Sequence, residues 1–211
     1  MQEQTPATVG QTPSPGRAPA VPGVRSVDHV GVTVPDLDEA VALFTSLLGA
    51  DLLYVAGPWT DDRHEWMPAA LDVRQATTLR LAMLRLGPWT NLELLEFTGG
   101  PVAAPAPLSA PGTAHLALHV DDLDAVAARL RADERVRVLA GPTTVPDGEP
   151  SAGLRYLYAV TPWGGFLEFV TWAPGMPYEA GTGGRMLPPA PSWAWRPEAG
   201  RAHGAPGTDG G

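Results

Sequence analysis

The sequence predicts an α+β fold built from two copies of one unit in which a strand is followed by a helix and further strands. The main observation is a repeat: residues 27–38 (VDHVGVTVPDLD) are echoed by residues 113–124 (TAHLALHVDDLD). Each copy has a histidine in a run of alternating apolar residues, followed by Asp-Leu-Asp. A second echo follows each copy, where residues 92–95 (LELL) correspond to residues 167–170 (LEFV). Each half therefore contributes one His and one Glu.

Side-chain periodicity assigns the first strand and helix of each copy. In a strand His29 shares one face with Gly31 and Thr33, while the valines take the other face. A helix beginning near Asp36, the predicted N-cap with Glu39 three residues on, carries an apolar stripe to cover the valines: Leu37, Val41, Phe44, Leu47 and Leu48. The second copy has the same design, with strand residues Leu116, Leu118 and Val120 facing helix residues Leu123, Val126, Ala127 and Leu130.

The remaining chain is divided by composition and turn signals. We expect a disordered arm over 1–23, a folded domain over 24–173 and a Pro/Gly/Trp-rich tail over 174–211. Within the domain, module one covers 24–99, a Pro/Ala-rich linker covers 100–112, and module two covers 113–173. Further strands are expected at 50–55, 77–86, 91–97, 136–139, 154–160 and 166–172, with a loop over 141–153.

Bulk properties exclude several classes of protein. The chain has no cysteine, so any metal must be bound by nitrogen and oxygen. A net charge of -9 argues against a nucleic-acid surface, which needs clustered basic side chains. There is no apolar run long enough to cross a membrane and no signal-peptide pattern, so a cytoplasmic protein is expected.

Four residues carry the candidate chemistry: His29, Glu93, His115 and Glu168. Because the helices cover the opposite faces, all four are expected on the uncovered, concave side of the sheets. One reading makes each an ordinary structural residue on a solvated face. The repeat favours the other reading, a shared divalent cation, which offsets the cost of desolvating four polar groups together.

An insert at residues 57–67 (GPWTDDRHEWM) is rich in aromatic and titratable residues. It predicts either a short surface helix, capped by Asp62 with Glu65 in its first turn, or a lid over the concave side. As a lid it would bring His64 or Glu65 to the substrate as a proton-transfer group.

The pattern of these four residues on two consecutive units resembles the vicinal oxygen chelate superfamily over residues 24–173. That superfamily includes glyoxalase I, methylmalonyl-CoA epimerase, extradiol dioxygenases, and fosfomycin and bleomycin resistance proteins. The resemblance implies two βαβββ modules whose curved mixed sheets form a cup around a metal, usually in a homodimer. It makes His29 and His115 the first-strand ligands, and Glu93 and Glu168 the last-strand ligands.

Two histidines and two carboxylates suit a divalent ion such as Ni, Co, Zn, Mn or Fe(II), among which the sequence does not choose. A small substrate with adjacent oxygens would complete the coordination. We expect an epimerase or isomerase that removes the proton alpha to a chelated carbonyl through an enediolate-like intermediate. Glu168 is the first choice for the base, with Glu93 or an insert residue as the opposing acid.

The Trp-rich insert and tail are similar in composition to the cyclitol epimerases of natural-product pathways in this superfamily. Three alternatives stay open: a glyoxalase I-type lyase, an Fe(II) extradiol dioxygenase and an antibiotic-binding resistance protein. The dioxygenase uses a two-His-one-carboxylate site, against which the fourth ligand counts. A resistance protein would need only an aromatic cup.

Overall fold

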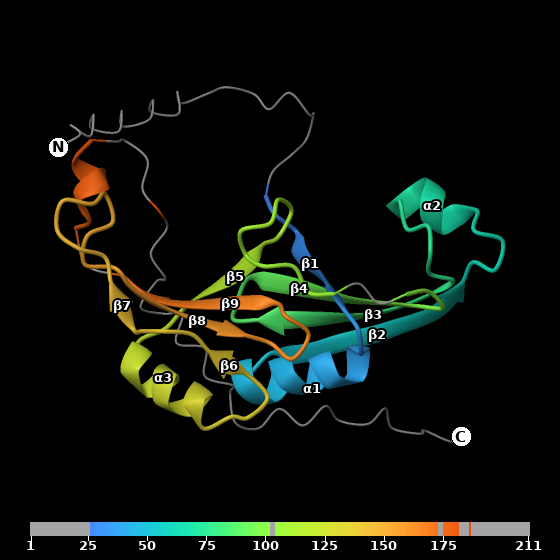
Figure 1. The fold of residues 1–211 in the computed structure, drawn as a ribbon, viewed down its shortest axis with the longest axis horizontal. Helices are drawn as coiled ribbons and strands as arrows, with labels where there is room; N and C mark the ends of the chain where they lie inside the picture. The colour runs from blue at the N-terminus through green and yellow to red at the C-terminus, as the bar shows by residue number, and fades with distance from the viewer. Residues whose placement is uncertain (1–25, 102–103, 173–174, 182–185, 187–211) are drawn as a thin grey trace, which may run out of the picture.

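The computed structural model describes residues 26–101, 104–172, 175–181 and 186. The predicted arm at 1–23 and most of the predicted tail at 174–211 lie outside these residues. The described residues form two curved mixed sheets, with helices α1 (Leu37–Leu48) and α3 (Leu123–Arg131) packed along one side of them (Figure 1). This arrangement confirms the predicted α+β fold class.

The first sheet has the strand order β1-β4-β3-β2. Its strands are β1 (His29–Val34), β2 (Asp51–Thr60), β3 (Thr78–Leu86) and β4 (Thr90–Thr98). β1 runs parallel to β4, while β3 is antiparallel to both β4 and β2. Helix α1 (Leu37–Leu48) connects β1 to β2, and the short helix α2 (Trp66–Leu71) lies between β2 and β3.

The second sheet repeats this topology with shorter elements. Its order is β5-β9-β8-β6, with β7 also paired to β8. The strands are β5 (His115–His119), β6 (Arg137–Val138), β7 (Thr143–Thr144), β8 (Arg155–Val160) and β9 (Phe166–Thr171). Again the first strand runs parallel to the last. Helix α3 (Leu123–Arg131) takes the place of α1, and a 3-10 turn η1 (Pro177–Ala180) follows the sheet.

Helix α1 begins and ends where its sequence requires. The Asp36 carboxylate accepts a hydrogen bond from the Glu39 backbone N–H at 2.9 Å, which confirms the predicted N-cap. Gly49 ends the helix in the left-handed region at φ 69°, where a glycine has no Cβ penalty. In α3 the equivalent cap is Asp122, which accepts from the backbone of Asp124 and Ala125.

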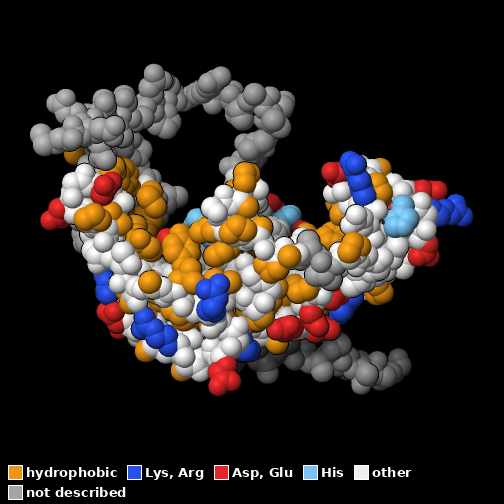
Figure 2. All heavy atoms as spheres, viewed as in Figure 1, with side chains coloured by type: hydrophobic (Ala, Val, Ile, Leu, Met, Phe, Trp, Pro, Cys, Tyr) orange, Lys and Arg blue, Asp and Glu red, His pale blue; other side chains and the backbone are white. Residues whose placement is uncertain are grey.

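The apolar faces of both sheets and of helices α1 and α3 share one core. Both helices lie on the same side of the sheets (Figure 1), and Phe44 of α1 meets Trp163 of module two with ring centroids 6.1 Å apart. Fully buried leucines in this core, such as Leu43 and Leu92, each contribute about 1.5–3 kcal/mol. In the space-filling view, charged side chains gather along the helical side, and apolar ones lie around the hollowed side (Figure 2).

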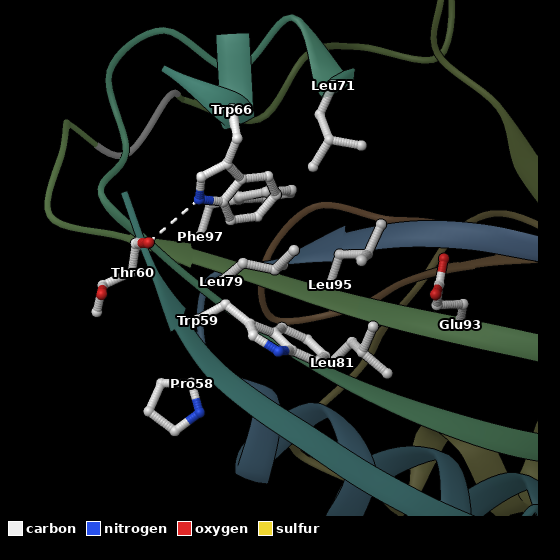
Figure 3. Close-up of a pocket in the computed structure, with 10 residues that line it drawn as sticks. All are labelled: Pro58, Trp59, Thr60, Trp66, Leu71, Leu79, Leu81, Glu93, Leu95 and Phe97. Atoms are coloured by element: carbon white, nitrogen blue, oxygen red, sulfur yellow. Dashed lines mark hydrogen bonds between the residues drawn. The ribbon is translucent and has the colours of Figure 1, made fainter. Parts of the chain in front are cut away.

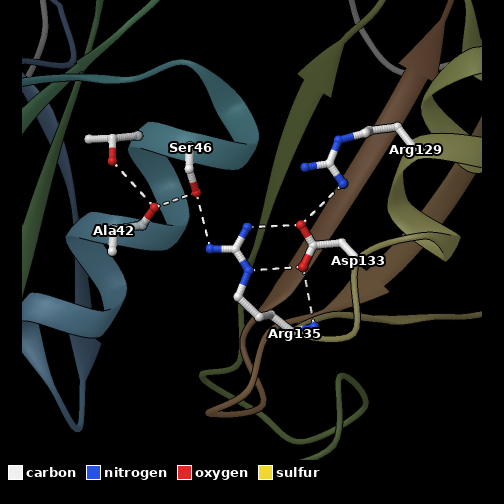
Figure 4. Close-up of polar contacts among 6 residues, drawn as sticks. Ala42, Ser46, Arg129, Asp133 and Arg135 are labelled. Carbon is white, nitrogen blue, oxygen red and sulfur yellow. Dashed lines mark hydrogen bonds and ion pairs between the residues drawn. The ribbon is translucent and has the colours of Figure 1, made fainter.

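A polar contact also joins the two modules on the helical side (Figure 4). Arg135 donates to both carboxylate oxygens of buried Asp133, at 2.9 and 2.8 Å, and to the Ser46 hydroxyl on α1 at 3.0 Å. Arg129 adds a further bond to Asp133 at 3.1 Å. The hydrogen bonds from Arg135 hold the pKa of Asp133 well below its usual 3.8.

Two strand boundaries and one loop differ from the sequence-based expectation. β2 runs to Thr60, past the expected end at Val55, because Trp59 and Thr60 still pair with β3 after a bulge that accommodates Gly57-Pro58. The expected strand at 136–139 is limited to Arg137–Val138, and the expected loop at 141–153 contains β7. In the described part of the chain, no helix is long and apolar enough to cross a membrane.

The lowered pKa of Asp133 predicts a pH-dependent contribution to stability. The carboxylate is stabilised in the folded protein, so its contribution is complete above its usual pKa of 3.8 and is lost as the pH falls below that value. Asp133→Asn should therefore lower the urea midpoint at pH 7, and the difference from wild type should shrink below pH 3.8. Glu134→Gln, at an exposed neighbour, is the control. A difference in urea midpoint that is the same at pH 7 and below pH 3.8 would contradict the prediction.

Candidate active site

Parallel pairing of the first and last strands brings each predicted histidine beside its predicted glutamate. In module one Gly31 pairs with Glu93, and in module two Ala117 pairs with Glu168. Each glutamate thus stands opposite the residue two positions after the histidine, which projects from the same face. The two modules therefore build the same pair in the same register.

The side chains of each pair meet through their terminal atoms. His29 Nε2 lies 3.4 Å from Glu93 Oε2, and His115 Nε2 lies 3.0 Å from Glu168 Oε2. The histidine side chains are each 38% exposed, whereas the glutamates are only 20% and 16% exposed. The pairs are thus partly buried but open to a ligand from the hollowed side of the sheets.

Asp28 determines which atom His29 offers to Glu93. The His29 Nδ1–H donates to the Asp28 carboxylate at 2.8 Å, and this bond, with a smaller effect from the charge of Glu93, raises the pKa of His29 above 6.5. A neutral His29 would then present a lone pair at Nε2 to a carboxylate oxygen. Two acceptor atoms that face each other need a proton or a cation between them. The donor set therefore fits a metal ion.

The distances between the His and Glu atoms of each pair also fit a shared metal ion. Two donors bound to one divalent ion at about 2.1 Å, at octahedral or tetrahedral angles, lie about 3.0–3.4 Å apart. The two pairs remain separate, however. Within the described ranges of one chain, no three His, Cys, Asp or Glu side chains are close enough to hold a metal ion. The structure places the four predicted ligands in two separate His–Glu pairs, which are called half-sites below because the prediction joins them in one site.

A cavity of about 780 Å³ adjoins the first half-site (Figure 3). Glu93 lies at one end of its lining, and the other walls are mainly apolar. They come from β2, α2, β3 and β4: Pro58, Trp59, Thr60, Trp66, Leu71, Leu79, Leu81, Leu95 and Phe97. An apolar concave wall with one polar group at its end is typical of a small-molecule site.

The insert forms one side of this cavity through its tryptophans. Trp66 of α2 lines the cavity and donates from Nε1 to the Thr60 carbonyl at 3.1 Å. His64 and Glu65, the predicted proton-transfer candidates, are exposed and are not among the lining residues. Their proposed catalytic role stays a prediction.

The predicted cap at Asp62 is wrong: Glu65, expected in the first turn, is the N-cap residue of α2, and the buried Asp61 carboxylate binds the backbone N–H groups at the start of the helix. This carboxylate accepts from the Glu65 and Met67 backbone N–H groups, at 2.9 and 2.8 Å. Burial by itself raises the pKa of Asp61, but these backbone donors and nearby His64 lower it overall. The sequence has two adjacent aspartates, and only the conformation of the turn in the folded protein determines which one points inward.

Asp61→Asn should loosen α2, because an amide replaces one of the two accepting oxygens at its N-terminus. Backbone amides of residues 65–71 should then exchange with deuterium faster than in wild type, as measured by mass spectrometry. Asp62→Asn is the matched control, since that side chain is exposed. Equal exchange in the two variants would show that Asp61 does not hold the helix.

Two residues beside the pairs, Asn91 and Tyr158, were not singled out in the sequence. Asn91 donates to the Asp28 carbonyl at 3.0 Å and accepts from Arg85 at 2.7 Å, so Asn91 and Arg85 brace the start of β1. Tyr158 stands directly opposite Glu168 on β8. Burial raises the pKa of Tyr158 to about 12, and the charge and hydrogen bonding of Glu168 add to this. In the sequence, only the alternation of side chains along β8 could have indicated that Tyr158 faces the same side as the predicted ligands.

Comparison with known proteins agrees with this geometry. The family model of the glyoxalase/bleomycin resistance protein/dioxygenase superfamily matches residues 28–154, more than half of the chain. The chain belongs to this superfamily. The matched region contains His29, Glu93 and His115 and ends before Glu168.

Individual members of the superfamily resemble this chain in sequence or in structure. A protein from an Actinomyces species named 2-epi-5-epi-valiolone epimerase is 46% identical over 175 residues, which cover 82% of this chain and 94% of the relative. A glyoxalase family protein from Bacillus cereus has a similar structure, with a TM-score of 0.56, 22% identity and coverage of 74% of this chain and 99% of that one. A superfamily domain from Frankia sp. gives a TM-score of 0.52, 21% identity and coverage of 71% and 99%. These two structures support the fold alone.

Proposed function

We propose that this protein is a cytoplasmic, homodimeric, metal-dependent epimerase that acts on a cyclitol ketone in natural-product metabolism. The observation that carries the proposal is the 46% identity, over 82% of the chain, with a protein named 2-epi-5-epi-valiolone epimerase. The two His–Glu pairs supply the groups that this chemistry needs. The cavity beside Glu93 would take the substrate.

The four residues would divide the work between binding and proton transfer. His29, Glu93, His115 and Glu168 would hold a divalent ion, which supplies Lewis-acid polarisation of the substrate carbonyl. Glu168 would remove the proton alpha to that carbonyl, giving an enediolate-like intermediate, and Glu93 would return a proton to the same carbon. Inversion would require these two carboxylates to approach opposite faces of that carbon.

We propose further that the two half-sites are completed across a homodimer. The pairs in one chain do not form a group of three ligands within the described residues. The edge strand β2 also exposes large apolar side chains, namely Leu52, Leu53, Tyr54, Val55 and Trp59. A long apolar edge strand is an aggregation hazard unless something covers it. A second copy would cover it and let the half-sites of different chains meet.

Metal content and proton exchange test the proposed chemistry. The purified protein should contain about one divalent ion per site, and both His29→Ala and Glu168→Ala should lose it. Wild type should catalyse metal-dependent incorporation of solvent deuterium into cyclitol ketones. The controls are His64→Ala and Glu65→Gln, which should retain the metal; loss of exchange in either would assign proton transfer to the insert.

Two results would count against this function. A metal-loaded protein that exchanges no proton would favour oxygenase or lyase chemistry over epimerisation. A wild-type protein that binds no metal, even after reconstitution, would contradict the four-ligand site.

Co-expression of two inactive variants tests the shared site. A dimer of His29→Ala with His115→Ala has one site with both substitutions and one with none. Random pairing makes about half of the dimers mixed, so about one quarter of wild-type activity should return. If all four ligands come from one chain, no activity returns. Mixed dimers isolated with two affinity tags, which should contain about half of the wild-type metal, provide a second readout.

A further inference from the structure

The two half-sites share their His–Glu pair but differ in the residue that faces the glutamate from the neighbouring strand. On β3 the residue paired with Glu93 is Met83, whereas on β8 the residue paired with Glu168 is Tyr158. Directly paired residues of antiparallel strands project from the same face with close Cβ atoms. Glu168 therefore has a hydroxyl-bearing neighbour where Glu93 has a thioether.

Packing orients the Tyr158 ring. Its edge-to-face contact with His115 has ring centroids 5.6 Å apart, and a second such contact, with Tyr156, has centroids 5.9 Å apart. The ring is thus held between the His115 imidazole and Tyr156, at the strand position directly opposite Glu168. A phenol hydroxyl can donate a hydrogen bond, and the carboxylate of Glu168, its direct partner on the neighbouring strand, can accept one.

The first half-site is ordered in another way. There the histidine is held, because Asp28 accepts from His29 Nδ1, and Asn91 donates to the Asp28 carbonyl. The second module has no equivalent of Asp28, since Ala114 precedes His115. In the first half-site the His29 imidazole is held in place. In the second, Tyr158 stands where it can hold the Glu168 carboxylate.

We infer that Tyr158 is a positioning residue of the second half-site, whose hydroxyl holds the Glu168 carboxylate with one oxygen directed to His115. The inference rests on the proposed function for its consequence: a carboxylate fixed in this way is ordered both for binding a metal ion and for removing a proton. Without the hydroxyl, the Glu168 carboxylate would keep its contact with His115 Nε2 at 3.0 Å but lose a group that limits its rotation. Partners that orient metal ligands typically change metal affinity or activity by 10–100-fold when removed.

Tyr158→Phe tests the inference, because it removes the hydroxyl and keeps the ring that packs on His115. The apo-protein would be titrated with Co²⁺ against a chromophoric chelator. We expect about 10–100-fold weaker binding and an altered Co²⁺ absorption spectrum. Tyr156→Phe is the matched control, since its side chain also contacts the Tyr158 ring. It should bind Co²⁺ as wild type does.

A second readout needs no metal. In the apo-protein the ¹⁵N resonance of His115 Nε2 should shift more than that of Nδ1 in Tyr158→Phe, because Nε2 faces the Glu168 carboxylate that loses the hydroxyl. They should stay in place in Tyr156→Phe. Unshifted His115 resonances in Tyr158→Phe, or wild-type Co²⁺ affinity and spectrum, would overturn the positioning role.

Failure of the proposed function would be seen differently. In that case wild type would bind no Co²⁺ and catalyse no exchange, which says nothing against the contact between Tyr158 and Glu168. The His115 resonances would still decide that contact. The two ideas can therefore fail separately.

Discussion

The parallel pairing of the first strand with the last strand in each module is the constraint on which the rest of the structure depends. It joins residues that are far apart in the sequence, Gly31 with Glu93 and Ala117 with Glu168, and so places each glutamate beside a histidine. A shift of one residue would turn the whole strand over and send Glu93 into the core. The buried leucines on either side of Glu93, Leu92 and Leu94, prevent that shift because they would lose their core contacts.

The same alternation gives a second carboxylate on β4 an opposite role. Glu96 lies on the helical side of the sheet, where it is buried, accepts from the Leu37 backbone N–H at 3.1 Å and pairs with Arg80 at 3.2 Å. Glu93, three residues earlier, faces the cavity. One carboxylate therefore secures the start of α1 to the sheet, while the other faces the cavity. Strand parity alone separates the structural Glu96 from Glu93, the predicted ligand.

Strand parity also explains how much could be predicted from the sequence. The repeat and its alternation predicted the faces of His29 and His115, and the Asp36 cap, because these depend on local periodicity. The choice of Asp61 over Asp62, and the pairing of Tyr158 with Glu168, depend on turns and strand registers that join distant segments. The extent of β2 was missed for the same reason: Gly57-Pro58 suggests a break, but pairing with β3 continues through a bulge.

Closure of the half-sites is an electrostatic requirement as well as a geometric one. A metal ion or a developing negative charge is stabilised by fixed donors far more strongly when water is excluded. In one chain each histidine of the pairs is 38% exposed, and the cavity beside Glu93 is bounded largely by apolar walls. Apolar walls around a polar centre serve catalysis only when something covers the open side. The proposed homodimer would cover both the exposed apolar residues of β2 and the open half-sites.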